Sequence, residues 1–144
     1  MNAGATTGTS ALNLGTLRQF GDHPALDLGA IGEKLLAELS PTVHAANRTL
    51  LVTEHFSFHM FATNRTEFCH YHPGDTLQRV LHGGGQFYVD YGKPVPQNPG
   101  DSFFIPKGKP HAFDGQLHGP SLVLVQWSPP YHDGYIIPTS GCRF

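Results

Sequence analysis

A chain of 144 residues has the length of one domain, and it can bury a hydrophobic core without disulfides or structural metals. Its formal net charge of -2 and its lack of long runs of like charge give no reason to expect nucleic acid or a membrane as a partner. No apolar run approaches the roughly 20 residues of a membrane span. Ten histidines are the unusual feature of the composition, and they direct attention to metal and acid–base chemistry.

The two cysteines, Cys69 and Cys142, do not indicate a disulfide framework. We therefore expect reduced thiols and a cytoplasmic location. The first residues also lack the basic and apolar regions of a secretory signal, which agrees with that expectation.

Residues 1–45 are predicted to lie outside the main fold. Residues 1–24 are small and polar, so we expect a mobile arm there. From Leu26 to Leu39 the apolar side chains recur close to helical spacing, and Pro41 ends the pattern. The sequence therefore predicts a short N-terminal helical extension.

Residues 46–144 are predicted to form one all-β domain. Their short runs of β-branched and aromatic residues are bounded by Gly, Pro or Asp, with turn signals about every 8–12 residues. This spacing is typical of a β-sandwich or β-barrel. The predicted strands are Leu50–Ala62, Thr66–His72, Leu77–Leu81, Gln86–Tyr91, Ser102–Ile105, Ala112–Phe113 and Leu122–Trp127.

Two histidine-containing segments flank a glycine turn and point to a metal site. The first is His70-Tyr71-His72, and alternate residues of a strand share a face, so both imidazoles would enter one cavity. The second runs from Gly100 through a buried strand and a Pro/Gly corner to His111. Between them, Gly83-Gly84-Gly85 predicts a tight hairpin turn.

In this order and spacing, the segments resemble both conserved motifs of the cupin superfamily over about residues 48–130. The resemblance implies a double-stranded β-helix, which is a jelly-roll barrel, and a divalent metal held by His70, His72 and His111. The alternative is a cupin that has lost its metal and keeps these histidines as hydrogen-bonded pocket residues.

The sequence departs from the family pattern at one ligand. The glutamate of the first cupin motif should fall at Thr76, which is a poor ligand. Gln78, His59 or water could take the fourth position. A ligand set without charge leaves the full +2 on the ion and strengthens it as a Lewis acid. We expect zinc, with iron, nickel, copper or manganese as alternatives.

A narrower resemblance is to the small cupin-type polyketide cyclases of bacterial aromatic polyketide pathways. It rests on the helical extension, the run Glu54–His59, the His70/His72 pair in Cys69–Asp75, and Ser128–Tyr131. It implies regiospecific aldol cyclisation and aromatisation of a poly-β-ketone. The expected partners are this small molecule, an acyl carrier protein that presents it, and a second copy in a homodimer.

The candidate catalytic residues are His59, His55 and Gln78. A neutral histidine, His59 or His55, could take a proton from the substrate, while Gln78 orients a carbonyl. Phenylalanines on the predicted strands would make the cavity apolar, which suits a carbonyl-rich substrate. The competing hypothesis is an iron or copper dioxygenase that acts on a diketone or a flavonol-like substrate.

Overall fold

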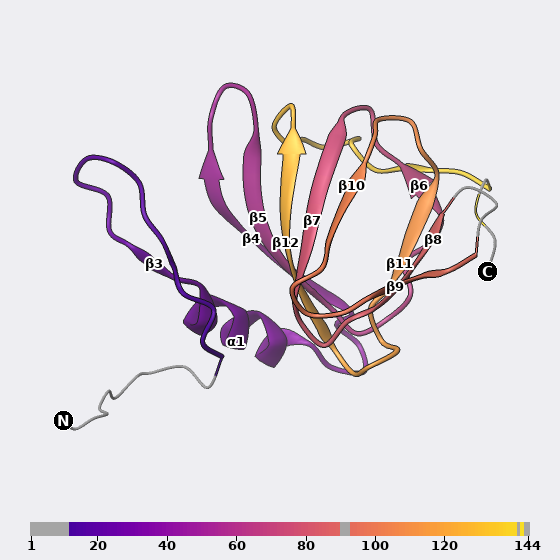
Figure 1. Cartoon of the computed structure of the whole chain (residues 1–144), viewed down its shortest axis with the longest axis horizontal. Helices are drawn as coiled ribbons and strands as arrows, with labels where there is room; N and C mark the ends of the chain where they lie inside the picture. The colour runs from indigo at the N-terminus through magenta and orange to yellow at the C-terminus, as the bar shows by residue number, and fades with distance from the viewer. Residues whose placement is uncertain (1–11, 90–92, 141, 143–144) are drawn as a thin grey trace.

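The computed structural model describes residues 12–89, 93–140 and 142. These residues form two five-stranded antiparallel sheets that face each other, with one helix outside them (Figure 1). This arrangement confirms the predicted all-β fold class with an N-terminal helical extension.

The first sheet has the strand order β10-β7-β12-β5-β4. It contains Ser102–Ile105 (β10), Asp75–His82 (β7), Ser121–Ser128 (β12), Ser57–Thr63 (β5) and Ala45–Val52 (β4). The second sheet has the order β13-β6-β11-β8-β9. It contains Ile137–Pro138 (β13), His70–Tyr71 (β6), His111–Asp114 (β11), Gly85–Val89 (β8) and Val95–Gln97 (β9).

Strand β5 shows why the first sheet buries both of its faces. Alternate side chains of a strand point to opposite faces. Phe61 packs against Val125 in the interior between the sheets, whereas Met60 and Ala62 belong to an outer cluster with Ile31 of the helix. The inner face of the first sheet therefore packs toward the second sheet, and the helix covers part of the outer face.

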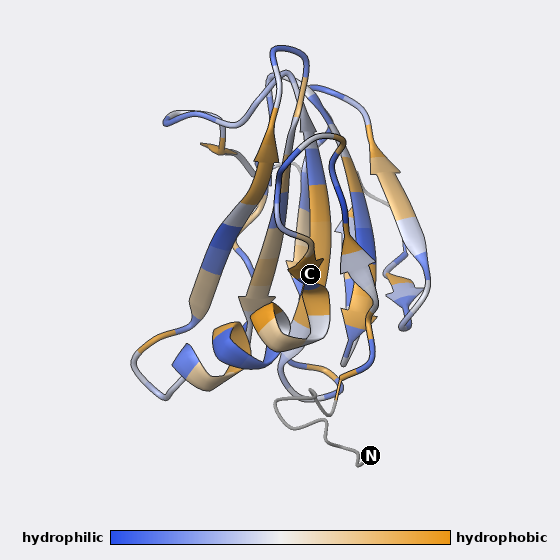
Figure 2. Cartoon of the chain, turned by 90° about the vertical axis from the view of Figure 1, so that its left-hand side faces the viewer, coloured by the Kyte–Doolittle hydropathy of each residue, from blue (hydrophilic) through white to orange (hydrophobic). Residues whose placement is uncertain are grey.

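Helix α1 spans Leu28–Glu38, within the predicted range. It begins there because the side chain of Asp27 accepts a hydrogen bond from the amide of Ala30 at 3.1 Å, which is an N-cap. Ile31 and Leu35 bury the apolar stripe of the helix against the first sheet (Figure 2). Among the described residues, no helix has the length and apolarity that a membrane crossing requires.

The segment before α1 differs from the predicted mobile arm. Residues 1–11 lie outside the described residues. From residue 12 the chain packs, because the leucines at 12, 14 and 17 contact the outer cluster. Thr16–Leu17 (β2) also pairs with Leu26–Asp27 (β3). Sparse apolar residues in a polar segment were not enough to predict this packing.

The strand predicted over Leu50–Ala62 is wrong, because a hairpin of β4 and β5 replaces it. Its turn carries no Gly or Pro. Instead the Thr53 hydroxyl accepts hydrogen bonds from the amides of His55 and Phe56, both at 3.1 Å. A side chain that closes a turn in this way leaves little signal in the sequence.

The predicted strand Thr66–His72 shortens to the two residues His70–Tyr71 (β6), because residues 67–69 have irregular backbone. The other predicted strands are confirmed with small changes at their ends. Ser102–Ile105 is reproduced residue for residue, while β7, β11 and β12 extend beyond their predictions. Strands β9 and β13 were missed because each is short and contains a proline, Pro96 or Pro138. The end of the predicted strand Gln86–Tyr91 lies outside the described residues.

The C-terminal segment, residues 129–140, adds strand β13 to the edge of the second sheet, beside β6. Ile137 pairs with Tyr71, and the amide of Thr139 donates to the carbonyl of Cys69 at 3.0 Å. Cys69 and Cys142 form a disulfide across a sequence separation of 73 residues. The expectation of reduced thiols is therefore wrong, because pairing of β13 with β6 brings the two cysteines together.

Candidate metal centre

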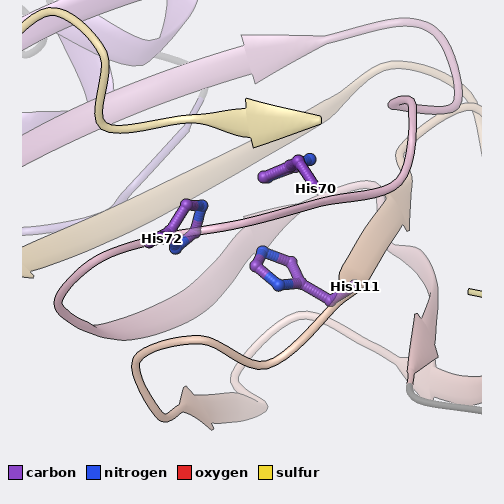
Figure 3. A group of neighbouring side chains, drawn as sticks. All are labelled: His70, His72 and His111. Carbon is purple, nitrogen blue, oxygen red and sulfur yellow. The ribbon is translucent and has the colours of Figure 1, made fainter. Parts of the chain in front are cut away.

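Three histidines converge in the interior because of the register between β6 and β11. His70 lies directly opposite His111 in this antiparallel pair. Residues opposite each other on neighbouring strands project their side chains from the same face. His72 follows directly after the end of β6, and its ring joins those of His70 and His111. Figure 3 shows the three rings turned toward one another, from two separate segments of the chain.

The geometry of the group suits one ion. One nitrogen from each ring lies within 4.8 Å of the others, and all three residues are buried. The ring centroids of His70 and His111 are 4.5 Å apart, and so are those of His72 and His111. Three imidazole nitrogens at this spacing could hold a divalent ion.

Each ring is oriented by a hydrogen bond at Nδ1. Nδ1 of His70 donates to the carbonyl of Phe68 at 2.8 Å, and Nδ1 of His111 donates to the carbonyl of Lys109 at 2.9 Å. Since a carbonyl can only accept, both rings carry their proton on Nδ1 and keep a lone pair on Nε2. Nδ1 of His72 lies 2.9 Å from the hydroxyl oxygen of Thr76, which can accept in the same way.

The unpaired nitrogen of His72 supports a bound ion. Its Nε2 is buried and has no hydrogen-bond partner. A buried polar atom without a partner costs free energy, and a metal at this point would satisfy it. The residues present therefore fit a divalent metal.

Two of the three histidines, His72 and His111, have lowered pKa values. Burial, together with the smaller effects of the charges of His111 and then His70, lowers the pKa of His72 to about 2. Burial also lowers the pKa of His111 to about 4, aided by the charge of His70 and opposed by the hydrogen bond to Lys109. Neutral imidazoles are the form that binds metals, so protons compete weakly at pH 7.

Comparison with known proteins assigns the barrel. Residues 58–125 match the family described as "Cupin domain", and this range includes His70, His72 and His111. The chain carries a cupin domain. Among proteins of curated function, no sequence matches it significantly.

Solved structures share this cupin fold at low sequence identity. TT1209 from Thermus thermophilus is 24% identical with a TM-score of 0.58, over 69% of this chain and 94% of that one. KdgF from Halomonas sp. is 21% identical with a TM-score of 0.56, over 66% and 86%. The polyketide cyclase RemF from Streptomyces resistomycificus is 21% identical with a TM-score of 0.59, over 67% and 72%.

The histidine group of this cupin domain borders a cavity of about 190 Å³. Aromatic and aliphatic side chains such as Phe61, Val125 and Trp127 form much of its wall. The C-terminal segment adds Tyr131 and Ile136, which are 38% and 37% exposed at the rim. The described residues of the lining include neither lysine nor arginine.

His59 lies in this cavity but outside the three-histidine group. Its Nε2 is 2.8 Å from the hydroxyl oxygen of Ser57, and its Nδ1 is 3.2 Å from that of Thr49. Burial lowers the pKa of His59, which favours the neutral ring at pH 7. To become a fourth ligand, His59 would have to leave one of the two hydroxyls.

The other two predicted residues have different positions. Gln78 lines the cavity, on the same face of β7 as Thr76, as the strand alternation predicts. The structure does not bring His55 to the cavity, because the residue lies in the turn between β4 and β5. Its side chain is 81% exposed and pairs with Glu54 at 3.0 Å.

Glu67 also lines the cavity, and sequence reasoning missed its carboxylate. In a regular strand, the side chain of residue 67 would point to the face opposite that of residue 70. That rule does not apply here, because residues 67–69 are not in a strand. Their irregular backbone turns Glu67 inward, and only the tertiary structure shows this.

Proposed function

We propose that this cupin domain is a metal-dependent polyketide cyclase, which closes and aromatises a ring by aldol chemistry on a poly-β-ketone. One observation carries the proposal: three histidine nitrogens converge beside a cavity that has apolar and aromatic walls. A bound divalent ion, which we propose to be zinc, would supply Lewis acidity toward a substrate carbonyl.

The lining of the cavity supports a neutral, carbonyl-rich substrate. The described residues of the wall include neither lysine nor arginine, so they offer no cationic side chain to pair with a phosphate or carboxylate group of a substrate. Trp127 and Tyr131, whose ring centroids are 5.0 Å apart, present flat apolar surfaces to a planar ring system. A chain longer than the cavity could extend past Tyr131 and Ile136 at the rim.

The polar residues have distinct proposed roles. Gln78 would donate its amide N–H to a carbonyl of the substrate and fix which carbon meets which carbonyl. His59, kept neutral by burial, would take the proton from the carbon between two carbonyls. Because Nε2 of His59 faces Ser57, that proton would pass after the Ser57 hydroxyl turns aside or through that hydroxyl.

The polyketide cyclase RemF supports this proposal by fold alone. KdgF and the DMSP lyase DddQ from Ruegeria pomeroyi DSS-3 share the same fold, so the fold does not select the reaction. The acyl carrier protein that would present the substrate and the second copy of a homodimer belong to the same proposal.

A mononuclear iron or copper dioxygenase is the second candidate. The observation that favours it is the neutral three-nitrogen set, which suits redox-active iron or copper as well as zinc. The two functions differ in their need for oxygen. Turnover of a poly-β-ketone without O2 by the zinc-loaded protein would support the cyclase, and strict dependence on O2 with iron or copper would support the dioxygenase.

The direct test is His72→Ala. It removes the nitrogen that has no partner in the cavity, so we expect loss of metal binding and of cyclisation together. Metal content by elemental analysis and product formation by mass spectrometry measure the two effects. His55→Ala is the matched control, because its exposed imidazole should affect neither. Full cyclisation by metal-free His72→Ala would contradict the proposal.

A further inference from the structure

We propose that Glu67 is the negatively charged partner of the metal centre. Its carboxylate would stabilise a divalent ion from outside the three-histidine group and would replace the charge that is missing at Thr76. The inference rests on the metal centre of the proposed function, and it does not depend on the identity of the substrate.

Two hydrogen bonds hold Glu67 beside the strand that carries His111. The amide of Glu67 donates to the carbonyl of Phe113 at 2.9 Å. In return, Oε1 of Glu67 accepts from the amide of Phe113 at 3.0 Å. Phe113 is two residues from His111 on β11, so the carboxylate is fixed to the same element as one of the three histidines.

The carboxylate lines the same cavity as the three histidines. The ligand nitrogens of the three histidines lie within 4.8 Å of one another, and the carboxylate of Glu67 does not belong to that group. We therefore do not count it as a ligand. The pKa of Glu67 is raised, because burial outweighs the lowering effects of the charge of His70 and of the hydrogen bond from Phe113. The charge of Arg65 lowers this pKa least. Because Glu67 and the three histidines line one cavity, a positive ion bound at the centre would act on this carboxylate.

Glu67 has little compensation from the protein itself. No lysine or arginine among the described residues lies within ion-pair distance of it, and Phe113 supplies its one hydrogen bond to the carboxylate. An ionised carboxylate removed from water is unfavourable unless a cation or several donors stabilise it. A cation in the cavity would provide this stabilisation.

The three-histidine centre lacks the negative charge that would balance a divalent ion. Three imidazoles and the Thr76 hydroxyl bring no negative charge to a divalent ion. In a cavity of low dielectric, attraction between opposite charges reaches beyond direct ligand distance. Among the described residues of the lining, Glu67 is the acidic side chain that can meet this need.

The test is Glu67→Gln, measured as Zn²⁺ affinity by competition with a chromophoric chelator. Glutamine keeps an oxygen that can accept from Phe113 and removes the charge. We expect the affinity for Zn²⁺ to fall about 10- to 100-fold, the usual effect of losing an outer-shell partner. Glu54→Gln is the matched control, because its exposed carboxylate should leave the affinity unchanged.

Thermal unfolding gives a second readout. Metal-free Glu67→Gln should melt no lower than the metal-free wild type, since a half-buried charge without an ion-pair partner is gone, and Zn²⁺ should raise its melting temperature by less. Glu67→Asp keeps the charge but shortens the reach to Phe113. It should therefore bind Zn²⁺ more tightly than Glu67→Gln.

Two outcomes would overturn the inference. If wild type and Glu67→Gln bind Zn²⁺ equally, or Glu67→Asp binds less tightly than Glu67→Gln, Glu67 serves only as a hydrogen-bond acceptor for Phe113. If the wild type itself binds no metal, the metal centre of the proposed function fails as well.

Discussion

Thr76 has a role at the residue scale that differs from that of a ligand. It stands where the cupin resemblance places a glutamate, and its hydroxyl oxygen lies 2.9 Å from Nδ1 of His72. An acceptor at Nδ1 holds the ring in the tautomer whose Nε2 lone pair faces the metal. Thr76 thus replaces the expected glutamate ligand but still helps to orient His72.

Thr76→Val tests this role. Valine has nearly the same shape but no acceptor, so His72 would lose its orienting hydrogen bond. We expect metal affinity to fall about tenfold with the fold retained, as measured by chelator competition and circular dichroism. Thr49→Val removes a comparable hydrogen bond from His59, outside the group, and should leave affinity unchanged. Equal affinities in both variants would contradict the assignment.

At the scale of elements, the first sheet and the C-terminal segment each depend on a crowded glycine. A Cβ at Gly32 of α1 would collide with the side chain of Leu122 on β12. A Cβ at Gly74 would collide with the Tyr135 hydroxyl and the Ser128 carbonyl, where the C-terminal segment begins. The two glycines therefore mark two separate close contacts.

Alanine at these glycines should have separable effects. Trp127, the single tryptophan, contacts Tyr131 and Tyr135 at ring-centroid distances of 5.0 and 5.1 Å. Gly74→Ala should displace these tyrosines and shift the Trp127 fluorescence emission to longer wavelength. Gly32→Ala should destabilise by about 1–3 kcal/mol through overpacking, with unchanged emission. Emission that shifts equally in both would show that the contacts are not independent.

At the scale of the whole molecule, a disulfide joins Cys142, which follows the C-terminal segment, to Cys69, the residue just before β6 and His70. Such a crosslink is uncommon in the reducing cytoplasm that the sequence led us to expect. It closes a loop of 73 residues, and crosslinks of this kind reduce the entropy of the unfolded chain.

Cys142→Ser should therefore lower the free energy of unfolding by about 2–4 kcal/mol. Denaturant titration of the metal-free protein measures the change. Adding a reductant to the wild type should produce a similar loss, while Cys142→Ser should not respond to it. A wild type that is equally stable with and without reductant would contradict a stabilising crosslink.

The histidine group makes the stability of the metal-free protein depend on pH. His72 and His111 have folded-state pKa values of about 2 and about 4, both below the ordinary value of 6.5. Below pH 6.5 the unfolded chain binds protons that the folded protein does not. Stability is therefore full above pH 6.5 and falls toward pH 4, by about 1.4 kcal/mol per pH unit for each histidine.

Chemical denaturation between pH 7 and 5, with a chelator present, measures this slope. His72→Gln removes one of the two titrating groups, so its slope averaged over this range should be shallower by about 1 kcal/mol per pH unit. His55→Gln, which changes an exposed ring, is the control. A slope that is the same in wild type and His72→Gln would contradict the burial argument.

The sequence by itself was enough for the features that depend on local periodicity. Alternation along a strand puts His70 and His72 on one face and Gln78 beside Thr76, and these relations hold for any strand. Turn residues marked the ends of most strands. The helical spacing of the apolar side chains, which ends at Pro41, located α1. Together with the cupin resemblance, these patterns were sufficient to predict that His111 belongs to the same site.

The tertiary structure alone decided what depends on irregular backbone and on pairing between distant segments. Glu67 turns into the cavity because residues 67–69 are not in a strand, so no periodicity predicts its direction. His55 lies outside the cavity because Thr53 closes a turn. The disulfide exists because β13 and β6, which are far apart in the sequence, pair side by side at the edge of the second sheet. Such long-range contacts arise from packing free energy summed over the whole chain, which no local pattern contains.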